Sequence, residues 1–180
     1  TYRDVASQKE FLKRNILFDK LFKFKDGPAE AVMGSFFLMP TFLFKELGGF
    51  DPDFFMYCEE LELCMRIKKL NKEICYLETQ HAIHKHGGSS TDSLQRMRQI
   101  YLSRFLLVYK QKGTMSAYLS LCIYFLNSIT NTLFLWKFDS AFRNTHWKDQ
   151  HAFYSNIINY IRVPFTYSRK RGNGTKMLKA

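Results

Sequence analysis

Two adjacent carboxylates, Glu59 and Glu60, stand where a predicted helix begins, and such a pair suits general-base chemistry. They follow the turn-forming run at 50–53, and the apolar spacing over 59–67 is helical. Backbone N–H groups at a helix N-terminus stabilise a carboxylate, and the like charge of a neighbour raises its affinity for a proton. The pair is therefore a candidate for taking a proton from a hydroxyl. The alternative is that Glu59, Glu60 and Glu62 only favour a helix start.

Histidines in a segment predicted to be extended form a second candidate site. His81 and His86 flank His84, and the glycine- and serine-rich run at 87–90 follows them. Imidazole is a common metal ligand, and the backbone N–H groups of a loop of this kind can bind an anion. His84 is therefore a candidate metal ligand, and Gly87 and Ser89 are candidates for contacting a phosphate. A simple turn is the alternative for the loop.

Arginines form the third group of candidate residues. Arg96, Arg98 and Arg104 lie on a helix predicted over 93–112. One of them can reach a phosphate group. The alternative is a solvated helix face.

The elements that must position these side chains alternate between strand and helix. An apolar run at 31–39 predicts a buried strand that contains Gly34, and a glycine inside a strand leaves room for a close approach. A short helix at 42–47 is ended by two glycines. A further strand is predicted at 73–77.

Four sequence motifs occur in a fixed order: G-S-F-F-L-M-P, G-G-F-D-P-D-F-F-M-Y, C-E-E-L-E-L-C-M-R and H-A-I-H-K-H-G-G-S-S. Together they resemble the second half of family 2 glycosyltransferases of the GT-A fold, notably the rhamnosyltransferase-like members that build bacterial surface polysaccharides. The resemblance covers about residues 31–112. It implies an α/β fold, in which residues 1–112 are the C-terminal portion of a Rossmann-like GT-A catalytic domain. We expect a hydrophobic and basic helical tail at 113–180.

The resemblance gives specific roles to the acidic pair and to one histidine. It implies that Glu60, the second of the pair, is the general base. The family more often has Asp at this place, so the longer Glu60 side chain leaves open which of Glu59 and Glu60 acts. The resemblance also implies that His84 helps to bind a divalent cation, Mg²⁺ or Mn²⁺, which holds the donor diphosphate.

Other residues are assigned to substrate binding by the same resemblance. Gly34 would border the donor sugar, and Arg104 would reach the diphosphate. Asp51 and Asp53 match the family's turn, where a structural role is favoured over catalysis. The family also has a nucleotide-binding half with its own Asp-x-Asp motif. The one Asp-x-Asp of this chain, at 51–53, follows Gly-Gly-Phe and matches the other turn, so the nucleotide-binding half is absent from these 180 residues. We therefore expect a piece of a longer protein that does not transfer sugar alone.

The function implied is that of an inverting glycosyltransferase. It would move a sugar from a nucleotide-sugar donor to a saccharide or lipid-linked acceptor in cell-surface polysaccharide synthesis. The alternative is a non-catalytic, membrane-associated binding or scaffold module with a degenerate GT-A fold. The acidic pair and His84 argue against that alternative, since a scaffold needs neither.

Charge and hydropathy add an expectation about the tail. The chain has a net charge of +11, and residues 137–180 hold nine Lys and Arg against two Asp, a local net of +7. Residues 114–136 carry no charge but are interrupted by Ser, Thr and Asn. We expect helices that lie on, or dip into, the cytoplasmic face of a bacterial inner membrane rather than one clean span. Packing as ordinary core is the alternative.

Two other classes of protein are disfavoured. The chain has no recognised nucleic-acid-binding motif, and its basic excess lies mainly in the tail, so nucleic acid is not expected as a partner. The cysteines lack the paired spacing of a zinc site. They are expected to be buried thiols in a reducing compartment: Cys58, Cys64, Cys75 and Cys122.

Overall fold

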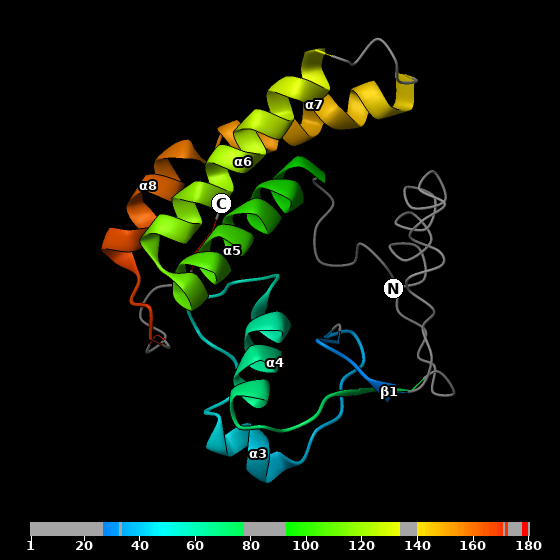
Figure 1. The fold of residues 1–180 in the computed structure, drawn as a ribbon, viewed down its shortest axis with the longest axis vertical. Coiled ribbons are helices and arrows are strands. Elements are labelled where there is room, and N and C mark those ends of the chain that lie inside the picture. The colour runs from blue at the N-terminus through cyan, green and yellow to red at the C-terminus, as the bar shows by residue number, and fades with distance from the viewer. Residues whose placement is uncertain are drawn as a thin grey trace. The chain divides into compact units, whose positions relative to one another are not determined.

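The computed structural model describes residues 27–32, 34–77, 93–133, 140–170, 172, 178 and 179. The chain divides into two compact units, whose elements are labelled in Figure 1. The first unit holds residues 1–49 and 63–91, and the second holds residues 50–62 and 92–180. Each unit has its own cluster of buried apolar side chains.

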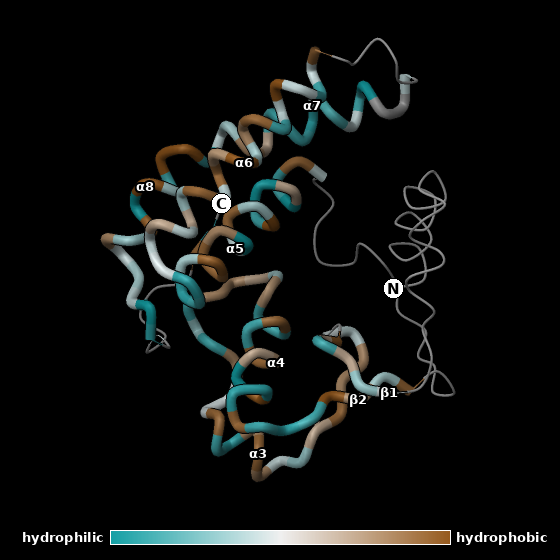
Figure 2. The backbone as a smooth tube through the Cα atoms, viewed as in Figure 1, coloured by the Kyte–Doolittle hydropathy of each residue, from teal (hydrophilic) through white to brown (hydrophobic). Residues whose placement is uncertain are grey.

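The first unit contains a small sheet, a short helix and most of a longer helix. Strand β1 (Gly27–Pro28) pairs antiparallel with β2 (Cys75–Tyr76), which lies within the strand predicted at 73–77 (Figure 2). Helix α3 spans Thr41–Glu46, and α4 spans Glu59–Lys69, whose first turn belongs to the second unit. The core of the first unit is formed by Leu63, Cys64, Ile67 and Ile74.

The strand predicted at 31–39 is wrong for the described residues. Residues 34–36 form a turn and 37–40 have no regular structure, so Gly34 lies exposed in a turn and not inside a strand. The apolar run nevertheless packs against the core of the first unit, through Ala31, Val32, Phe37 and Met39. These four side chains are partly buried, whereas Phe36 and Leu38 are exposed, and a continuous apolar run does not define the backbone conformation.

The helix ends of the first unit follow from residues that accept a positive φ. Gly48 and Gly49, with φ of 73° and 74°, follow α3, and Asn71, with φ of 54°, follows α4. The Arg66 guanidinium donates hydrogen bonds to the carbonyl oxygens of Leu47, at 2.6 Å, and Gly49, at 2.7 Å. Arg66 therefore fixes the turn after α3.

The second unit is a helical assembly built on α5. This helix spans Ser93–Lys112, which confirms the helix predicted at 93–112. It packs against α6 (Thr114–Leu133), α7 (Ser140–Tyr154) and α8 (Ile157–Thr166). Gly113, with φ of 88°, ends α5 and turns the chain into α6.

Aromatic side chains supply much of the core of the second unit. The rings of Tyr124 and Phe153 stack with their centroids 4.1 Å apart. The hydroxyls of Tyr101 and Tyr124 share a hydrogen bond of 2.7 Å. Leu102 and Leu106 are fully buried beside them. The high aromatic content of the sequence thus serves packing between the helices of this unit, where ring pairs add to the burial of apolar area.

Helices dominate the described residues, and the one sheet among them has two strands of two residues each. A GT-A fold and a boundary at residues 112 and 113 stay predictions. The extended segment predicted at 81–86 lies outside the described residues. Among the helices that the structure describes, none combines the length and the apolar character needed to cross a membrane.

Two of the four cysteines are buried and two are exposed. Cys58 and Cys64 are buried, whereas Cys75 and Cys122 are exposed, so the expectation of four buried thiols is wrong for two of them. Cys75 lies in the two-residue strand β2, both of whose residues are exposed. Cys122 lies on the exposed side of α6.

Candidate active site

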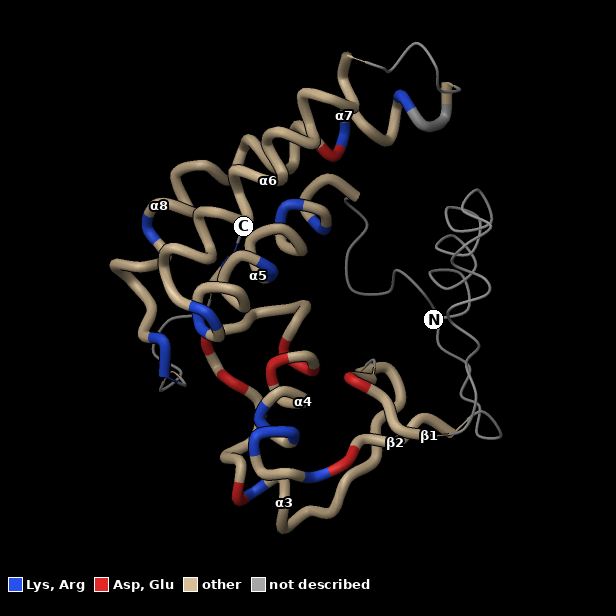
Figure 3. The backbone as a smooth tube through the Cα atoms, in the orientation of Figure 1, with Lys and Arg blue, Asp and Glu red and all other residues tan. Residues whose placement is uncertain are grey.

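The acidic pair occupies the first turn of α4. Glu59, Glu60 and Glu62 begin this helix and basic residues end it, as Figure 3 shows by colour. The Glu62 backbone N–H donates to the Cys58 carbonyl oxygen at 2.9 Å, so helical hydrogen bonding begins directly before the pair. This arrangement of charges complements the helix dipole, as the sequence predicts.

Both carboxylates of the pair have an oxygen that is shielded from solvent. The Oε2 atoms of Glu59 and Glu60 are buried, and neither has a hydrogen-bond partner among the described residues. Buried polar atoms in folded proteins are nearly always paired. Two adjacent carboxylate oxygens in this state are therefore acceptors that a hydroxyl or a bound water would satisfy.

Burial also changes the proton affinity of Glu59. The pKa of Glu59 lies above its ordinary value of 4.5. Burial of the carboxyl is the main cause, a backbone hydrogen bond opposes it, and the charge of Glu60 raises the pKa further. A carboxylate with a raised pKa is a better proton acceptor at neutral pH. The sequence predicts a raised pKa from the neighbouring charge alone, whereas the structure shows that burial is the larger cause of the shift.

The thiol beside the pair is not suited to nucleophilic chemistry. Burial raises the pKa of Cys58 from 9.0 to about 12, the charge of Arg104 lowers it, and the charges of Glu60 and Glu59 raise it. A thiol with so high a pKa stays protonated at neutral pH, and the thiolate is the nucleophilic form. The same electrostatic effects place Arg104 and the acidic pair around one buried side chain of the second unit.

Asp51 and Asp53, in the turn before the pair, are bound by a lysine that sequence reasoning missed. The Lys110 ammonium lies 2.6 Å from Asp51 Oδ2 and 2.5 Å from Asp53 Oδ2. All three side chains are buried. The sequence feature that could have drawn attention to Lys110 is its place directly after the apolar run Phe105–Tyr109, four residues after Leu106.

The other predicted site residues are placed as follows. Gly34 lies in the first unit, exposed in its turn. Arg104 lies on α5 with its side chain exposed. His84, Gly87 and Ser89 lie outside the described residues.

The described residues do not fit a divalent cation. No three His, Cys, Asp or Glu side chains among them are grouped so that they could hold a metal. Asp51 and Asp53 lie together, but the Lys110 ammonium occupies the position between their carboxylates. A role for Mg²⁺ or Mn²⁺ stays a prediction from the resemblance, and no chemical step is derived from it.

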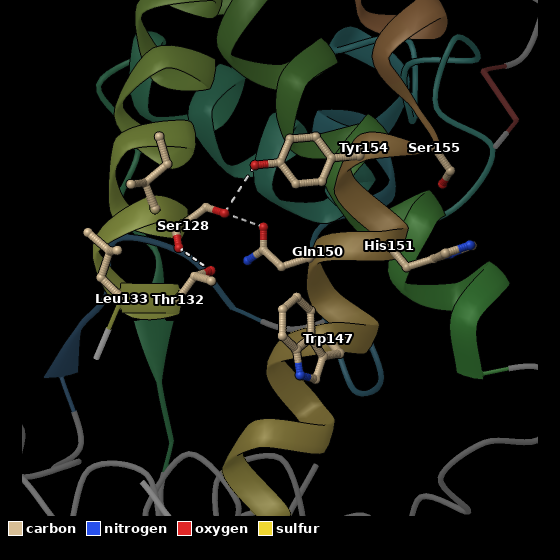
Figure 4. Close-up of a pocket in the computed structure, with 9 residues that line it drawn as sticks. Ser128, Thr132, Leu133, Trp147, Gln150, His151, Tyr154 and Ser155 are labelled. Carbon is tan, nitrogen blue, oxygen red and sulfur yellow. Dashed lines mark hydrogen bonds between the residues drawn. The ribbon is translucent and has the colours of Figure 1, made fainter. Parts of the chain in front are cut away.

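The second unit also has a groove between α6 and α7 (Figure 4). It encloses about 650 Å³ and is largely apolar. The Ser128 hydroxyl at its base donates to the Gln150 side chain and shares a hydrogen bond of 3.1 Å with Tyr154. Its lining residues are Ser128, Ile129, Thr132, Leu133, Trp147, Gln150, His151, Tyr154 and Ser155.

Two curated glycosyltransferases are similar to part of the chain. The chain is 36% identical over 61 residues to the rhamnosyltransferase WbbL of Escherichia coli (strain K12), which covers 34% of the chain and 23% of that protein. It is 32% identical over 82 residues to a low-salt glycan biosynthesis hexosyltransferase of Haloferax volcanii, which covers 44% of the chain and 26% of that protein. The match thus spans about a quarter of the length of each relative. No family model and no solved structure matches the chain.

Proposed function

We propose that this chain is the acceptor half of an inverting glycosyltransferase of family 2 with a GT-A fold. The observation that carries the proposal is the acidic pair at the start of α4, whose two buried Oε2 atoms have no partner among the described residues. The partial similarity to two glycosyltransferases supports the same chemistry. The activity would belong to the complete protein, in which the nucleotide of the donor would be bound by a half that lies outside these residues.

The proposed reaction is a single displacement. Glu60 accepts the proton of an acceptor hydroxyl, and the acceptor oxygen forms a bond to the anomeric carbon of the donor sugar. The bond from that carbon to the diphosphate oxygen breaks, and its electron pair leaves with the nucleoside diphosphate. A carboxylate that is held at a helix N-terminus and partly desolvated is a suitable base for this step. The charge of Glu60 in turn raises the pKa of Glu59, whose carboxyl is also partly buried.

The proposal extends to binding of the donor. Gly34 and Arg104 are proposed to border the donor sugar and its diphosphate. His84 with a divalent cation, and Gly87 with Ser89, are proposed to hold the diphosphate. These assignments rest on the resemblance, and the requirement for a cation in transfer assays tests the role of His84.

A membrane surface is the proposed location of the acceptor. The exposed side of α6 carries a row of large apolar side chains at Met115, Leu119, Ile123, Leu126, Ile129 and Leu133. Apolar rows of this length on a helix are typical of helices that lie in a membrane interface. We place the complete protein at the cytoplasmic face of a bacterial inner membrane, where a lipid-linked saccharide would be within reach.

The test is a transfer assay with the complete protein and a panel of labelled nucleotide sugars. Transfer to a saccharide or lipid-linked acceptor with inverted anomeric configuration is expected. Transfer with retained configuration contradicts the single displacement. Binding to vesicles with no transfer from any donor favours the non-catalytic scaffold instead.

A further inference from the structure

One face of α5 carries three buried polar side chains. Gln99, Ser103 and Lys110 are separated by four and then seven residues, so they lie on one side of the helix. Ser103 is fully buried. Polar groups enclosed in this way are expected to have specific partners. Their partners lie in residues 51–58, directly before the acidic pair, and near the C-terminus of the chain.

The Lys110 ammonium uses all three of its N–H donors. It donates to Asp51 Oδ2, at 2.6 Å, to Asp53 Oδ2, at 2.5 Å, and to the Lys170 carbonyl oxygen, at 3.1 Å. Asp51 Oδ1 accepts two more hydrogen bonds, from the backbone N–H groups of Asp53, at 3.0 Å, and Gly172, at 3.2 Å. One cation and two backbone donors thus hold both carboxylates in place.

Ser103 and Gln99 hold the same segment further along. The Ser103 hydroxyl donates to the Met56 carbonyl oxygen at 2.7 Å. The Gln99 amide donates to the Ser103 hydroxyl, at 3.1 Å, and to the Leu178 carbonyl oxygen, at 2.9 Å. Leu178 in turn donates its backbone N–H to the Asp53 carbonyl oxygen at 2.8 Å. The C-terminal residues therefore close the network around residues 51–58.

The end of this segment has an uncommon backbone conformation. Tyr57 and Cys58 both have φ of 67°, in the left-handed region that non-glycine residues seldom adopt. Two such residues in succession persist only where the surroundings fix them. Glu59 follows them directly as the first residue of α4. The direction in which the chain enters this helix, and with it the position of the acidic pair, therefore depends on this conformation.

We propose that Ser103 and Lys110 are positioning residues for the acidic pair and act through residues 51–58. Their hydrogen bonds go to Met56, Asp51, Asp53 and Lys170. In this way, they hold the strained backbone from which Glu59 and Glu60 project. The role in turnover rests on the proposed function, in which the pair takes a proton from an acceptor hydroxyl.

The effect on turnover follows from the geometry that proton transfer requires. A general base acts only within hydrogen-bond reach of the hydroxyl. A displacement of about 1 Å can lower the rate by about a hundredfold. A small loosening of residues 54–58 should therefore lower kcat while substrate KM values stay nearly constant, because the binding residues are not changed.

Ser103→Ala is the mildest test, and Ser120→Ala is its matched control. Each removes one serine hydroxyl from a helix of the second unit, but the Ser120 hydroxyl donates only to Ala117 of its own helix, at 2.6 Å. In the complete protein, kcat per donor-binding site should fall about tenfold in Ser103→Ala. It should stay unchanged in Ser120→Ala, and KM should change by less than about twofold in both.

Two further variants disturb the aspartates. A Cβ added at Gly172 would lie 1.8 Å from Asp53 Oδ1, so Gly172→Ala must displace that carboxylate without changing any charge. Lys110→Met combined with Asp51→Asn and Asp53→Asn removes the buried charges together, which avoids leaving an unpaired ion. Both should fold, and both should show the same loss of kcat at nearly constant KM.

Amide hydrogen exchange over residues 54–60 separates this inference from the proposed function. Exchange should be faster in Ser103→Ala than in Ser120→Ala, whether or not transfer is detected. Equal exchange in the two variants overturns the inference. If Glu60→Gln abolishes transfer but Ser103→Ala and the triple variant keep full kcat, the inference fails and the proposed function stands. If the wild-type protein transfers no sugar, the proposed function fails, and the exchange result still decides whether α5 holds the segment.

Discussion

Glu59 and Glu60 are adjacent in the first turn of α4, and each has one buried carboxylate oxygen without a hydrogen-bond partner among the described residues. The pKa of Glu59 is raised, first by burial and further by the charge of Glu60. Acid–base sites typically contain two carboxylates of which one has a raised pKa. The different roles of these two residues can be separated by single substitutions.

The first prediction concerns Glu60. In the complete protein, Glu60→Gln should lower turnover by about a hundredfold or more, because glutamine cannot accept the proton of the acceptor hydroxyl. Donor affinity, measured by calorimetry, should hardly change. Glu46→Gln, at an exposed position that ends α3, is the control and should leave turnover intact. Near-normal turnover in Glu60→Gln contradicts the assignment, and a larger loss in Glu59→Gln moves the base to Glu59.

The second prediction concerns pH and Glu59. Because its pKa is raised in the folded protein, the folded state takes up a proton at Glu59 more readily than the unfolded state. The stability contributed by this proton is fully present below the ordinary value of 4.5 and is lost as pH rises through the raised pKa. The free energy of unfolding of the wild type, minus that of Glu59→Gln, should therefore fall across this window.

Urea unfolding at a series of pH values above and below 4.5 measures this difference. The same subtraction with Glu46→Gln, an exposed glutamate, serves as the control. If the difference between the wild type and Glu59→Gln does not change with pH, burial does not shift the proton affinity of Glu59.

The helices and their ends could be predicted from local sequence, whereas one strand could not. Gly113 and Asn71 end helices because they adopt positive φ at little steric cost, and this property is visible in the residue type. Part of the apolar run at 31–39 packs on the core of the first unit, while Phe36 and Leu38 are exposed. Apolar character indicates burial, but the turn at residues 34–36 depends on packing that local sequence does not contain.

The candidate site could be predicted only in part for a similar reason. The acidic pair is visible because its two carboxylates are adjacent at a helix start. The contacts of Lys110 with Asp51 and Asp53 span 59 and 57 residues, so no local pattern links them. Lysine is seldom buried unless it is paired, so neither the burial of Lys110 nor its partners follow from local sequence.

The third prediction concerns the stability of the Lys110 cluster. Lys110→Met leaves two buried carboxylates without their cation, and breaking a buried pair in this way costs about 3–5 kcal/mol. Lys112→Met, at an exposed position on the same helix, should change the free energy of unfolding by less than about 0.5 kcal/mol. Urea unfolding of both variants measures this. Adding Asp51→Asn and Asp53→Asn to Lys110→Met should restore most of the stability, and an equal loss in Lys110→Met and Lys112→Met contradicts the burial of the cluster.

The last prediction concerns the exposed row of α6. Removing the whole tail is a poor test, because α6, α7 and α8 share a core with α5 and its loss would uncover Leu102 and Phe105. Leu119→Gln with Ile123→Gln instead changes two exposed apolar side chains. Burying each such side chain is worth about 1.5–3 kcal/mol, so this pair should weaken binding to the membrane by about tenfold or more.

Co-sedimentation of the complete protein with vesicles that contain anionic phospholipid measures the effect. Asn127→Gln with Thr130→Gln changes two exposed polar residues of the same helix and should bind as the wild type does. High salt should weaken the binding of all forms, because attraction of basic side chains to anionic headgroups is screened. Unchanged sedimentation of the Leu119→Gln, Ile123→Gln variant would mean that the α6 row does not enter the membrane, since the loss of two apolar side chains from a buried face must reduce the affinity.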